Sequence, residues 1–160
     1  MKLSTKTKAN YYLKVFSLTK IPLLWFCRPK IINLSAECIE IKIPLKRRTK
    51  NHLNNMYFGA LSVGADITGG FLALPSIQKS KRKITLLFKD FNAKFLRRAE
   101  ADVHFICKDG IAVNNLVQKA IDTKERQNYT LKIIAKTPTI SNDIVAEFDL
   151  TLSIKDYTDL

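Results

Sequence analysis

Apolar positions recur at two spacings along the chain, and the changes between them predict its elements. Where apolar residues return every three or four positions, the spacing predicts helices. The predicted helices cover residues 1–27, with an end near Pro22 or Pro29, residues 56–74, and residues 111–126. Pro75 is expected to end the second helix, because proline lacks the amide hydrogen that a helix interior needs.

Alternation of apolar and polar residues predicts strands, most clearly over residues 39–43. The pairs Asp109-Gly110 and Asn142-Asp143 mark turns. The predicted strands are residues 31–45, 84–88, 94–107, 129–136 and 143–154. This order predicts a single α+β domain over residues 1–160, in which a mostly antiparallel sheet wraps around a long central helix. An N-terminal helix precedes the sheet, and the helix after Gly110 interrupts it.

Composition narrows the class of partner. A hydrophobic fraction of 46% and a charged fraction of 26% over 160 residues are ordinary for one globular domain with a core. The net charge of +13 favours an anionic partner, such as a phosphorylated cofactor, a nucleic acid or an acidic membrane surface. Nucleic acid is not expected, because the basic runs have neither a recognisable module nor interleaved aromatic residues.

Cysteine and histidine usage indicates a cytoplasmic protein without a metal site. Cys27, Cys38 and Cys107 are an odd number without the spacing of a disulfide framework or a zinc site. His52 and His104 lack the neighbouring ligands that a tetrahedral metal needs.

The first helix is not expected to touch a membrane. Lysines interrupt the apolar residues 11–27, which leaves runs too short for the roughly 20 residues of a membrane span. A helix folded onto the core is favoured, and a basic amphipathic helix lying on a membrane surface is the alternative.

One carboxylate stands out within the central segment. Asp66 lies among small residues that would let a helix pack closely against a sheet or a ligand. At 3.6 residues per turn, Gly59, Val63, Asp66 and Gly70 share one face of that helix. This geometry suits acyl-group chemistry, with the alternative that Asp66 is a structural acid bonded to backbone or to an arginine such as Arg97.

The segment from Asn51 through Gly59 to Asp66 resembles the hotdog-fold thioesterases that act on phenylacetyl-CoA and hydroxybenzoyl-CoA, and most of all a branch of unknown function. In those enzymes the motif runs roughly Asn, two residues, Gly-Thr, one residue, His-Gly-Gly, followed by a helix with Asp or Glu. Tyr57 stands where they have the histidine, and Phe58 where they have the glycine after it. Residues 90–99 are similar to the strand that ends in Phe-Leu-Arg-Pro-Ala, with an arginine in place of the proline.

The resemblance implies roles for four residues in thioester cleavage. Asp66 would be the general base or the nucleophile, and Asn51 would orient water or substrate. The amide of Gly59, at the positive end of the helix, would polarise the carbonyl. Tyr57 would donate a hydrogen bond to the substrate, or alternatively form a wall of the pocket.

The resemblance also implies the ligand and the assembly. The substrate would be an acyl-CoA or related thioester, so that coenzyme A enters with the substrate and no separate cofactor is expected. Phe58, Lys81, Arg82 and Arg97 are the candidate contacts to coenzyme A, and a solvated basic surface is the alternative for the cations. The protein would be a homodimer or a dimer of dimers with sites at the subunit junction. A non-catalytic acyl-ligand binder or interaction module of the same fold is the competing function, because Tyr57 and Phe58 replace His-Gly.

Overall fold

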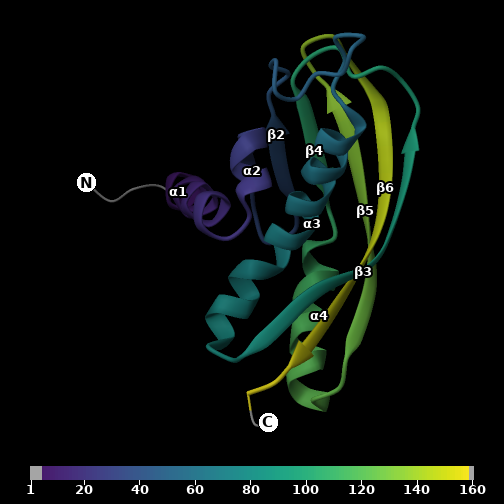
Figure 1. The fold of residues 1–160 in the computed structure, drawn as a ribbon. Helices are drawn as coiled ribbons and strands as arrows, with labels where there is room; N and C mark the ends of the chain where they lie inside the picture. The colour runs from purple at the N-terminus through teal and green to yellow at the C-terminus, as the bar shows by residue number, and fades with distance from the viewer. Residues whose placement is uncertain (1–4, 159–160) are drawn as a thin grey trace.

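The computed structural model describes residues 5–158, and it contains one six-stranded sheet partly wrapped around a helix (Figure 1). The strand order is β1-β2-β4-β5-β6-β3, and every neighbouring pair is antiparallel. The helices are α1 (Thr5–Thr19), α2 (Pro22–Cys27), α3 (Phe58–Ser80) and α4 (Gly110–Thr123). The strands are β1 (Lys30–Leu34), β2 (Ile39–Ile43), β3 (Ile84–Phe95), β4 (Val103–Cys107), β5 (Gln127–Thr137) and β6 (Ser141–Asp156). The predicted α+β class with a curled antiparallel sheet around a long helix is confirmed.

The core lies between the concave face of the sheet and α3, with α4 beside α3 on the same face (Figure 1). The alternating isoleucines of β2 are fully buried on this face. Gly64 allows the close approach of α3, because a Cβ added at this position would lie 2.2 Å from the ring of buried Phe105. The small residues of α3 therefore bring its backbone against the sheet.

The central helix α3 is longer than predicted, and it continues through Pro75 to Ser80. Pro75 cannot donate a hydrogen bond to the Phe71 carbonyl, which weakens the helix locally. The helix continues because Leu74 and Ile77 still pack against the core on either side of the proline. By length and composition α3 could span a membrane, but 56% of its apolar window is buried within this domain.

Four other predictions of element boundaries were wrong. The N-terminal helix is divided at Lys20 and Ile21, before Pro22. The predicted strand 31–45 is a hairpin, whose turn is held by the Ser35 hydroxyl as it accepts hydrogen bonds from the backbone of residues 37 and 38. The predicted strand 94–107 is interrupted by a loop over residues 96–102, and the β5–β6 turn lies at residues 138–140 rather than at Asn142-Asp143.

The Asn10 side chain joins helix α1 to the edge strand β1 by two hydrogen bonds. The Asn10 carboxamide oxygen accepts a hydrogen bond from the Ile31 amide at 2.8 Å, and its nitrogen donates to the Ile31 carbonyl at 3.0 Å. The side chain thus satisfies both backbone groups of one residue, as a neighbouring strand would. Leu13, on the same side of α1, is 1% exposed and belongs to the core.

Candidate active site around Asp66

A pocket of about 320 Å³ lies between α1, α3 and β3, and Asp66 is its one ionisable lining residue. Asp66 and Gly70 come from the exposed side of α3, Leu86 and Phe88 come from β3, and Phe16 comes from α1. The other lining residues are Ile21, Ile67, Phe71, Leu74 and Leu87. A cavity of this size with apolar walls and one charged group is typical of a small-molecule site.

The Asp66 carboxylate has no partner within residues 5–158: it makes no hydrogen bond and no ion pair there. Arg97, which the sequence suggested as a structural partner, instead pairs with Asp143 at 3.3 Å. Burial raises the pKa of Asp66, since desolvation disfavours its charged form and nothing nearby compensates. A half-buried, unpaired carboxylate beside an apolar cavity is more basic than a surface aspartate.

A β-bulge in β3 shapes the wall that faces Asp66. Phe88 pairs with Leu152 and Asp90 with Thr151, so Lys89 is an extra residue without a partner in β6. The bulge shifts the alternation by one position. As a result Leu86 and Phe88 before it, and Phe91, Ala93 and Phe95 after it, all lie opposite inward-facing residues of β6.

Two exposed aromatic side chains lie at the start of α3. Tyr57 caps the helix by its backbone alone and is 48% exposed, and Phe58 is 57% exposed. The two rings lie 4.7 Å apart between centroids, and Phe58 is in edge contact with Phe95. A Cβ added at Gly59 would lie 2.6 Å from the Tyr57 ring. The absence of a side chain at Gly59 therefore leaves room for this ring over the helix start. Tyr57 therefore shields the Gly59 side of the helix.

Gly59 and Asp66 share a face of α3, but they lie far apart along it. Seven residues at 1.5 Å each place them about 10 Å apart along the axis. Gly59 is not among the residues that line the Asp66 pocket. Within one chain, the pocket therefore does not bring the Gly59 amide and the Asp66 carboxylate together.

Asn51 holds its own loop. Its side-chain oxygen accepts hydrogen bonds from the amides of Leu53 at 2.9 Å and Asn55 at 3.1 Å. This is the arrangement of an Asx turn, and it leads the chain into the start of α3. The structure places Asn51 outside the Asp66 pocket.

The candidate contacts to coenzyme A do not form one cluster. Lys81 and Arg82 follow the C-terminal end of α3, whereas Phe58 begins this helix more than 20 residues earlier. Arg97 lies in the loop after β3, where the Ala99 carbonyl accepts a hydrogen bond from the Met56 amide just before α3. Arg82 is bound to Asp156, with its Nε 2.6 Å from the buried carboxylate. Burial raises the pKa of Asp156, but hydrogen bonds from Thr158, Arg82 and Lys124 outweigh that effect and hold it well below its usual range.

The histidines and cysteines form no comparable site. Within residues 5–158 no three His, Cys, Asp or Glu side chains gather where they could hold a metal ion. His104 is partly buried and lies with its Nδ1 2.6 Å from Glu40 across β2 and β4. Burial raises the pKa of Cys107 to about 12, which leaves its thiol protonated and unreactive.

Residues 10–154 match the domain of unknown function DUF4442. The chain belongs to the DUF4442 family. No curated protein matches the sequence of this family member.

Solved structures share the fold of this DUF4442 protein. A thioesterase from Haemophilus influenzae is 19% identical, with a TM-score of 0.67 over 97% of this chain and 93% of that one. A thioesterase candidate of unknown function from Pseudomonas aeruginosa is 23% identical, with a TM-score of 0.79 over 98% and 99%. A protein of unknown function from Chlorobaculum tepidum is 15% identical, with a TM-score of 0.80 over 94% and 96%. These likenesses establish the fold that the sequence motif predicted.

Sequence reasoning missed the part of the pocket wall that comes from the N-terminal segment. Phe16 and Ile21 reach the pocket from the N-terminal segment, some 50 residues before Asp66 in the sequence. Their only signal was the apolar face of the first predicted helix, which does not say what the face packs against. Leu86 and Phe88 could have been found, because they are the inward positions of an alternating strand.

Proposed function

We propose that this protein hydrolyses an acyl-CoA-type thioester, with Asp66 as the general base. The observation that carries the proposal is the unpaired Asp66 carboxylate in an apolar pocket of about 320 Å³. Apolar walls suit the acyl group, and burial makes the carboxylate a stronger base than an exposed one. The fold shared with thioesterases agrees with this chemistry.

In this mechanism Asp66 accepts one proton and later returns it. Its carboxylate takes a proton from a water molecule, whose oxygen attacks the thioester carbonyl carbon. The carbon–sulfur bond then breaks, the acid is released, and the coenzyme A thiolate takes the proton back from Asp66. Orienting the water against the carboxylate contributes about 10²- to 10⁴-fold to the rate.

A second copy of the chain would complete the site. Gly59 lies about 10 Å along α3 from Asp66 and does not line the Asp66 pocket, so we place the amide that polarises the carbonyl on Gly59 of a second copy. Strand β3 is an edge strand of 12 residues, with Leu87, Phe91 and Phe95 exposed. A long edge with exposed apolar residues favours pairing with another strand, which supports a homodimer.

The homodimer is tested by a charge on the β3 edge. Leu87→Lys is expected to shift the protein from a dimer to its 18.3 kDa monomer, because the substitution places a buried charge in the joint sheet. Light scattering after size exclusion measures the mass. Ile111→Lys is the matched control, since Ile111 on α4 is also 58% exposed but lies away from the edge. A wild-type protein that is monomeric at every concentration tested would refute the shared site.

Hydrolysis is tested by turnover of a panel of aliphatic and aromatic acyl-CoAs, with release of free thiol as the signal. We expect the rate to fall as the pH drops through the raised pKa of Asp66, because only the carboxylate accepts a proton from water. The acidic limb of kcat/KM should have its midpoint above 3.8, the ordinary value for this group. An acidic limb of kcat/KM with its midpoint at or below 3.8 would exclude a desolvated Asp66 as the base.

The second candidate is a binder of acyl ligands without catalysis. It is favoured by Tyr57, whose ring covers the Gly59 side of the helix start where a substrate carbonyl would bind. This function predicts saturable binding of acyl-CoA, measured by calorimetry, without release of thiol from any member of the panel. Turnover that depends on Asp66 would exclude it.

A further inference from the structure

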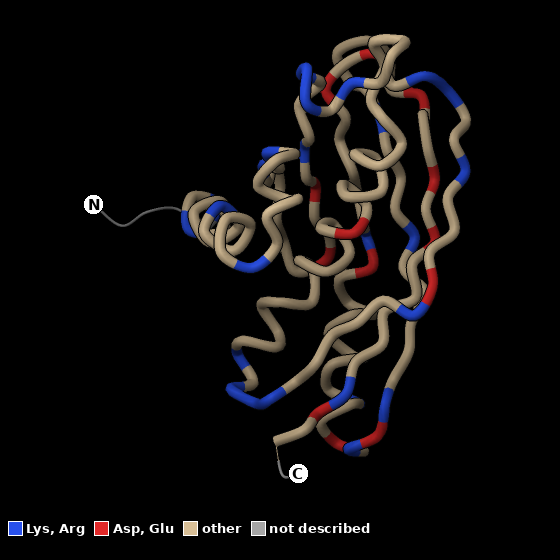
Figure 2. The backbone as a smooth tube through the Cα atoms, viewed as in Figure 1, with Lys and Arg blue, Asp and Glu red and all other residues tan. Residues whose placement is uncertain are grey.

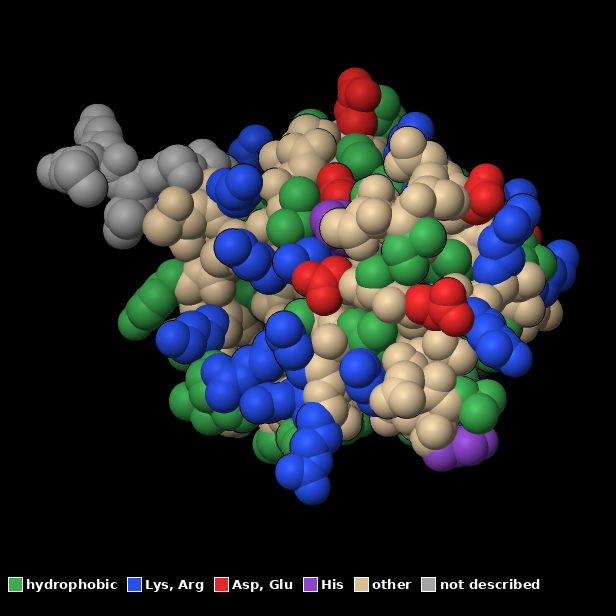
Figure 3. Space-filling view, turned by 90° about the horizontal axis from the view of Figure 1, so that it is seen from above, with side chains coloured by type: hydrophobic (Ala, Val, Ile, Leu, Met, Phe, Trp, Pro, Cys, Tyr) green, Lys and Arg blue, Asp and Glu red, His purple; other side chains and the backbone are tan. Residues whose placement is uncertain are grey.

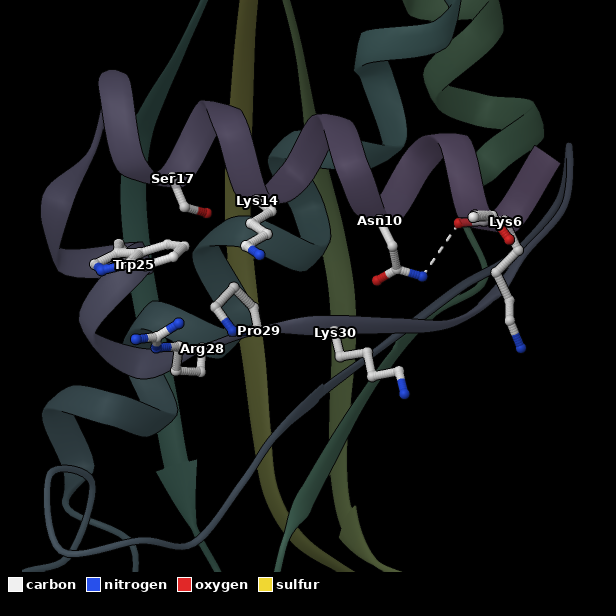
Figure 4. A pocket seen from close by; sticks show the side chains of 9 residues that line it. Lys6, Asn10, Lys14, Ser17, Trp25, Arg28, Pro29 and Lys30 are labelled. Carbon is white, nitrogen blue, oxygen red and sulfur yellow. Dashed lines mark hydrogen bonds between the residues drawn. The ribbon is translucent and has the colours of Figure 1, made fainter. Parts of the chain in front are cut away.

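A second and larger pocket, of about 560 Å³, lies between α1, α2 and the start of β1 (Figure 4). Its lining includes Lys6 and Lys14 from α1, Trp25 from α2, Arg28 from the end of α2, and Lys30 from the start of β1. Asn10 lies on the same side of α1 and fixes that helix to β1. The pocket shares no lining residue with the Asp66 pocket.

The charge of this pocket has one sign. None of its lining residues is acidic, and the first acidic residue of the sequence is Glu37. The charged residues of α1 are all lysines (Figure 2), and Figure 3 shows Lys and Arg side chains on the side of the molecule that carries the N-terminus. Within residues 5–158 the side chains of Lys6, Lys14, Arg28 and Lys30 make no ion pair. Like charges in a concave site reinforce one another's potential and attract an anion.

Two of the cations are positioned by Trp25. The Arg28 guanidinium carbon lies 3.9 Å from the centre of the indole ring, and the Lys14 ammonium lies 5.9 Å from it. Arg28 ends α2 in a left-handed conformation, with φ of 57°, and its backbone amide closes the helix on the Leu24 carbonyl. This geometry directs the arginine side chain back over the tryptophan. The guanidinium edge remains available, because stacking uses only its face.

The polar groups near the cations are already used within the protein. The Ser17 hydroxyl donates to the Leu13 carbonyl at 2.7 Å, and the Asn10 carboxamide is engaged with Ile31 and Lys6. The hydrogen-bond donors left for a ligand are therefore the cationic side chains, and the apolar part of the lining is Trp25 and Pro29. A ligand that needs several hydrogen-bond acceptors and a negative charge fits these donors better than a neutral one.

The geometry points to a binding site for a phosphate group in this pocket, separate from the Asp66 pocket. The ligand class is a compound with a phosphomonoester or a diphosphate. Arg28 binds phosphate oxygens through its guanidinium edge, and Lys6, Lys14 and Lys30 supply further charge. Either a soluble phosphorylated metabolite or a lipid headgroup presents this chemistry.

Trp25 makes the site directly measurable, because it is the only tryptophan of the chain. Titration with pyrophosphate is expected to change the tryptophan fluorescence saturably, and the affinity should fall as salt is raised. Titration with sodium chloride at equal ionic strength is the control for screening. A response that does not saturate, or that chloride reproduces, would overturn the proposal.

The double variant Lys14→Gln/Arg28→Gln tests the assignment of residues. Pyrophosphate affinity should fall by tenfold or more, since each charge-assisted contact is worth roughly tenfold in affinity. Lys46→Gln/Arg47→Gln removes the same charge from a basic loop outside this pocket and should leave the affinity within about twofold, as expected for distant exposed charges. Asp66→Asn should also leave it unchanged. Equal losses in both double variants would show non-specific attraction to a basic protein.

The source of the phosphate is decided by competition. Adenosine 3′,5′-bisphosphate represents soluble ligands, and vesicles of phosphatidylglycerol represent headgroups, with phosphatidylcholine vesicles as the neutral control. Displacement of pyrophosphate by the bisphosphate alone assigns a soluble ligand. Displacement by the anionic vesicles alone assigns a headgroup. Failure of both to compete with bound pyrophosphate would refute a phosphate site of biological use.

Discussion

Asp66→Asn is expected to lower the turnover of the best acyl-CoA substrate by about 10²- to 10⁴-fold, the usual contribution of a positioned base. Asparagine keeps the size of the side chain and removes only its ability to take a proton. KM should change little, because the apolar walls that hold the acyl group remain. Thiol release at saturating substrate measures the effect.

The same substitution is expected to stabilise the fold at neutral pH. Burial raises the pKa of Asp66, so the contribution of this group to folding is fully present below its unfolded pKa and is lost as the pH rises through the folded pKa. Asparagine avoids the cost of a desolvated charge. Thermal unfolding should therefore occur at a higher temperature for Asp66→Asn than for wild type near pH 7, and the difference should vanish in acid.

Asp122→Asn is the control for both measurements, because Asp122 is exposed on α4 and its side chain accepts a hydrogen bond from Gln118 on the same helix. It should change neither turnover nor unfolding. Asp66→Asn with full activity would remove Asp66 from the mechanism. Loss of activity together with loss of stability would instead identify a structural acid.

Gly64→Ala is expected to destabilise the protein by about 1–3 kcal/mol or more, the usual cost of overpacking a core. The added methyl group would lie 2.2 Å from the ring of Phe105, which is fully buried and cannot move aside without displacing its neighbours. In an exposed helix the same change stabilises by roughly 0.5–1 kcal/mol. The sign of the change in unfolding free energy, from urea denaturation, therefore reports the close packing of α3 on the sheet.

Gly70→Ala provides the matched control on the same helix. Its added methyl group would meet the Phe88 ring at 3.8 Å, an ordinary contact. We expect this variant to gain the roughly 0.5–1 kcal/mol of helix propensity that Gly64→Ala cannot realise. Two variants of equal stability would show that α3 does not pack as described.

The fold was largely predictable from local pattern, because period and turn chemistry are local properties. The alternation over residues 39–43 and the small-residue segment around Asp66 located β2 and α3 correctly. Pro75 was misjudged because core contacts of Leu74 and Ile77 outweigh the cost of one missing hydrogen bond. Tertiary packing of this kind leaves no local signal.

The candidate site was predictable only in part, for the same reason. Motif spacing selected Asp66, and the structure gives it an apolar pocket. The proposed pairing with Arg97 failed because the loop after β3 directs that arginine to Asp143. The separation of Lys81 and Arg82 from Arg97 follows from the length of α3, which the sequence underestimated by placing its end before Pro75.

Helix α1 contributes Phe16 to the Asp66 pocket and Lys14 to the basic pocket, and the Asn10 side chain links it to the sheet. Helix α1 thus forms part of the wall of both pockets. A molecule that displaces α1 from either side changes the volume on the other side, and thermodynamic reciprocity requires the second ligand to act back on the first with equal strength.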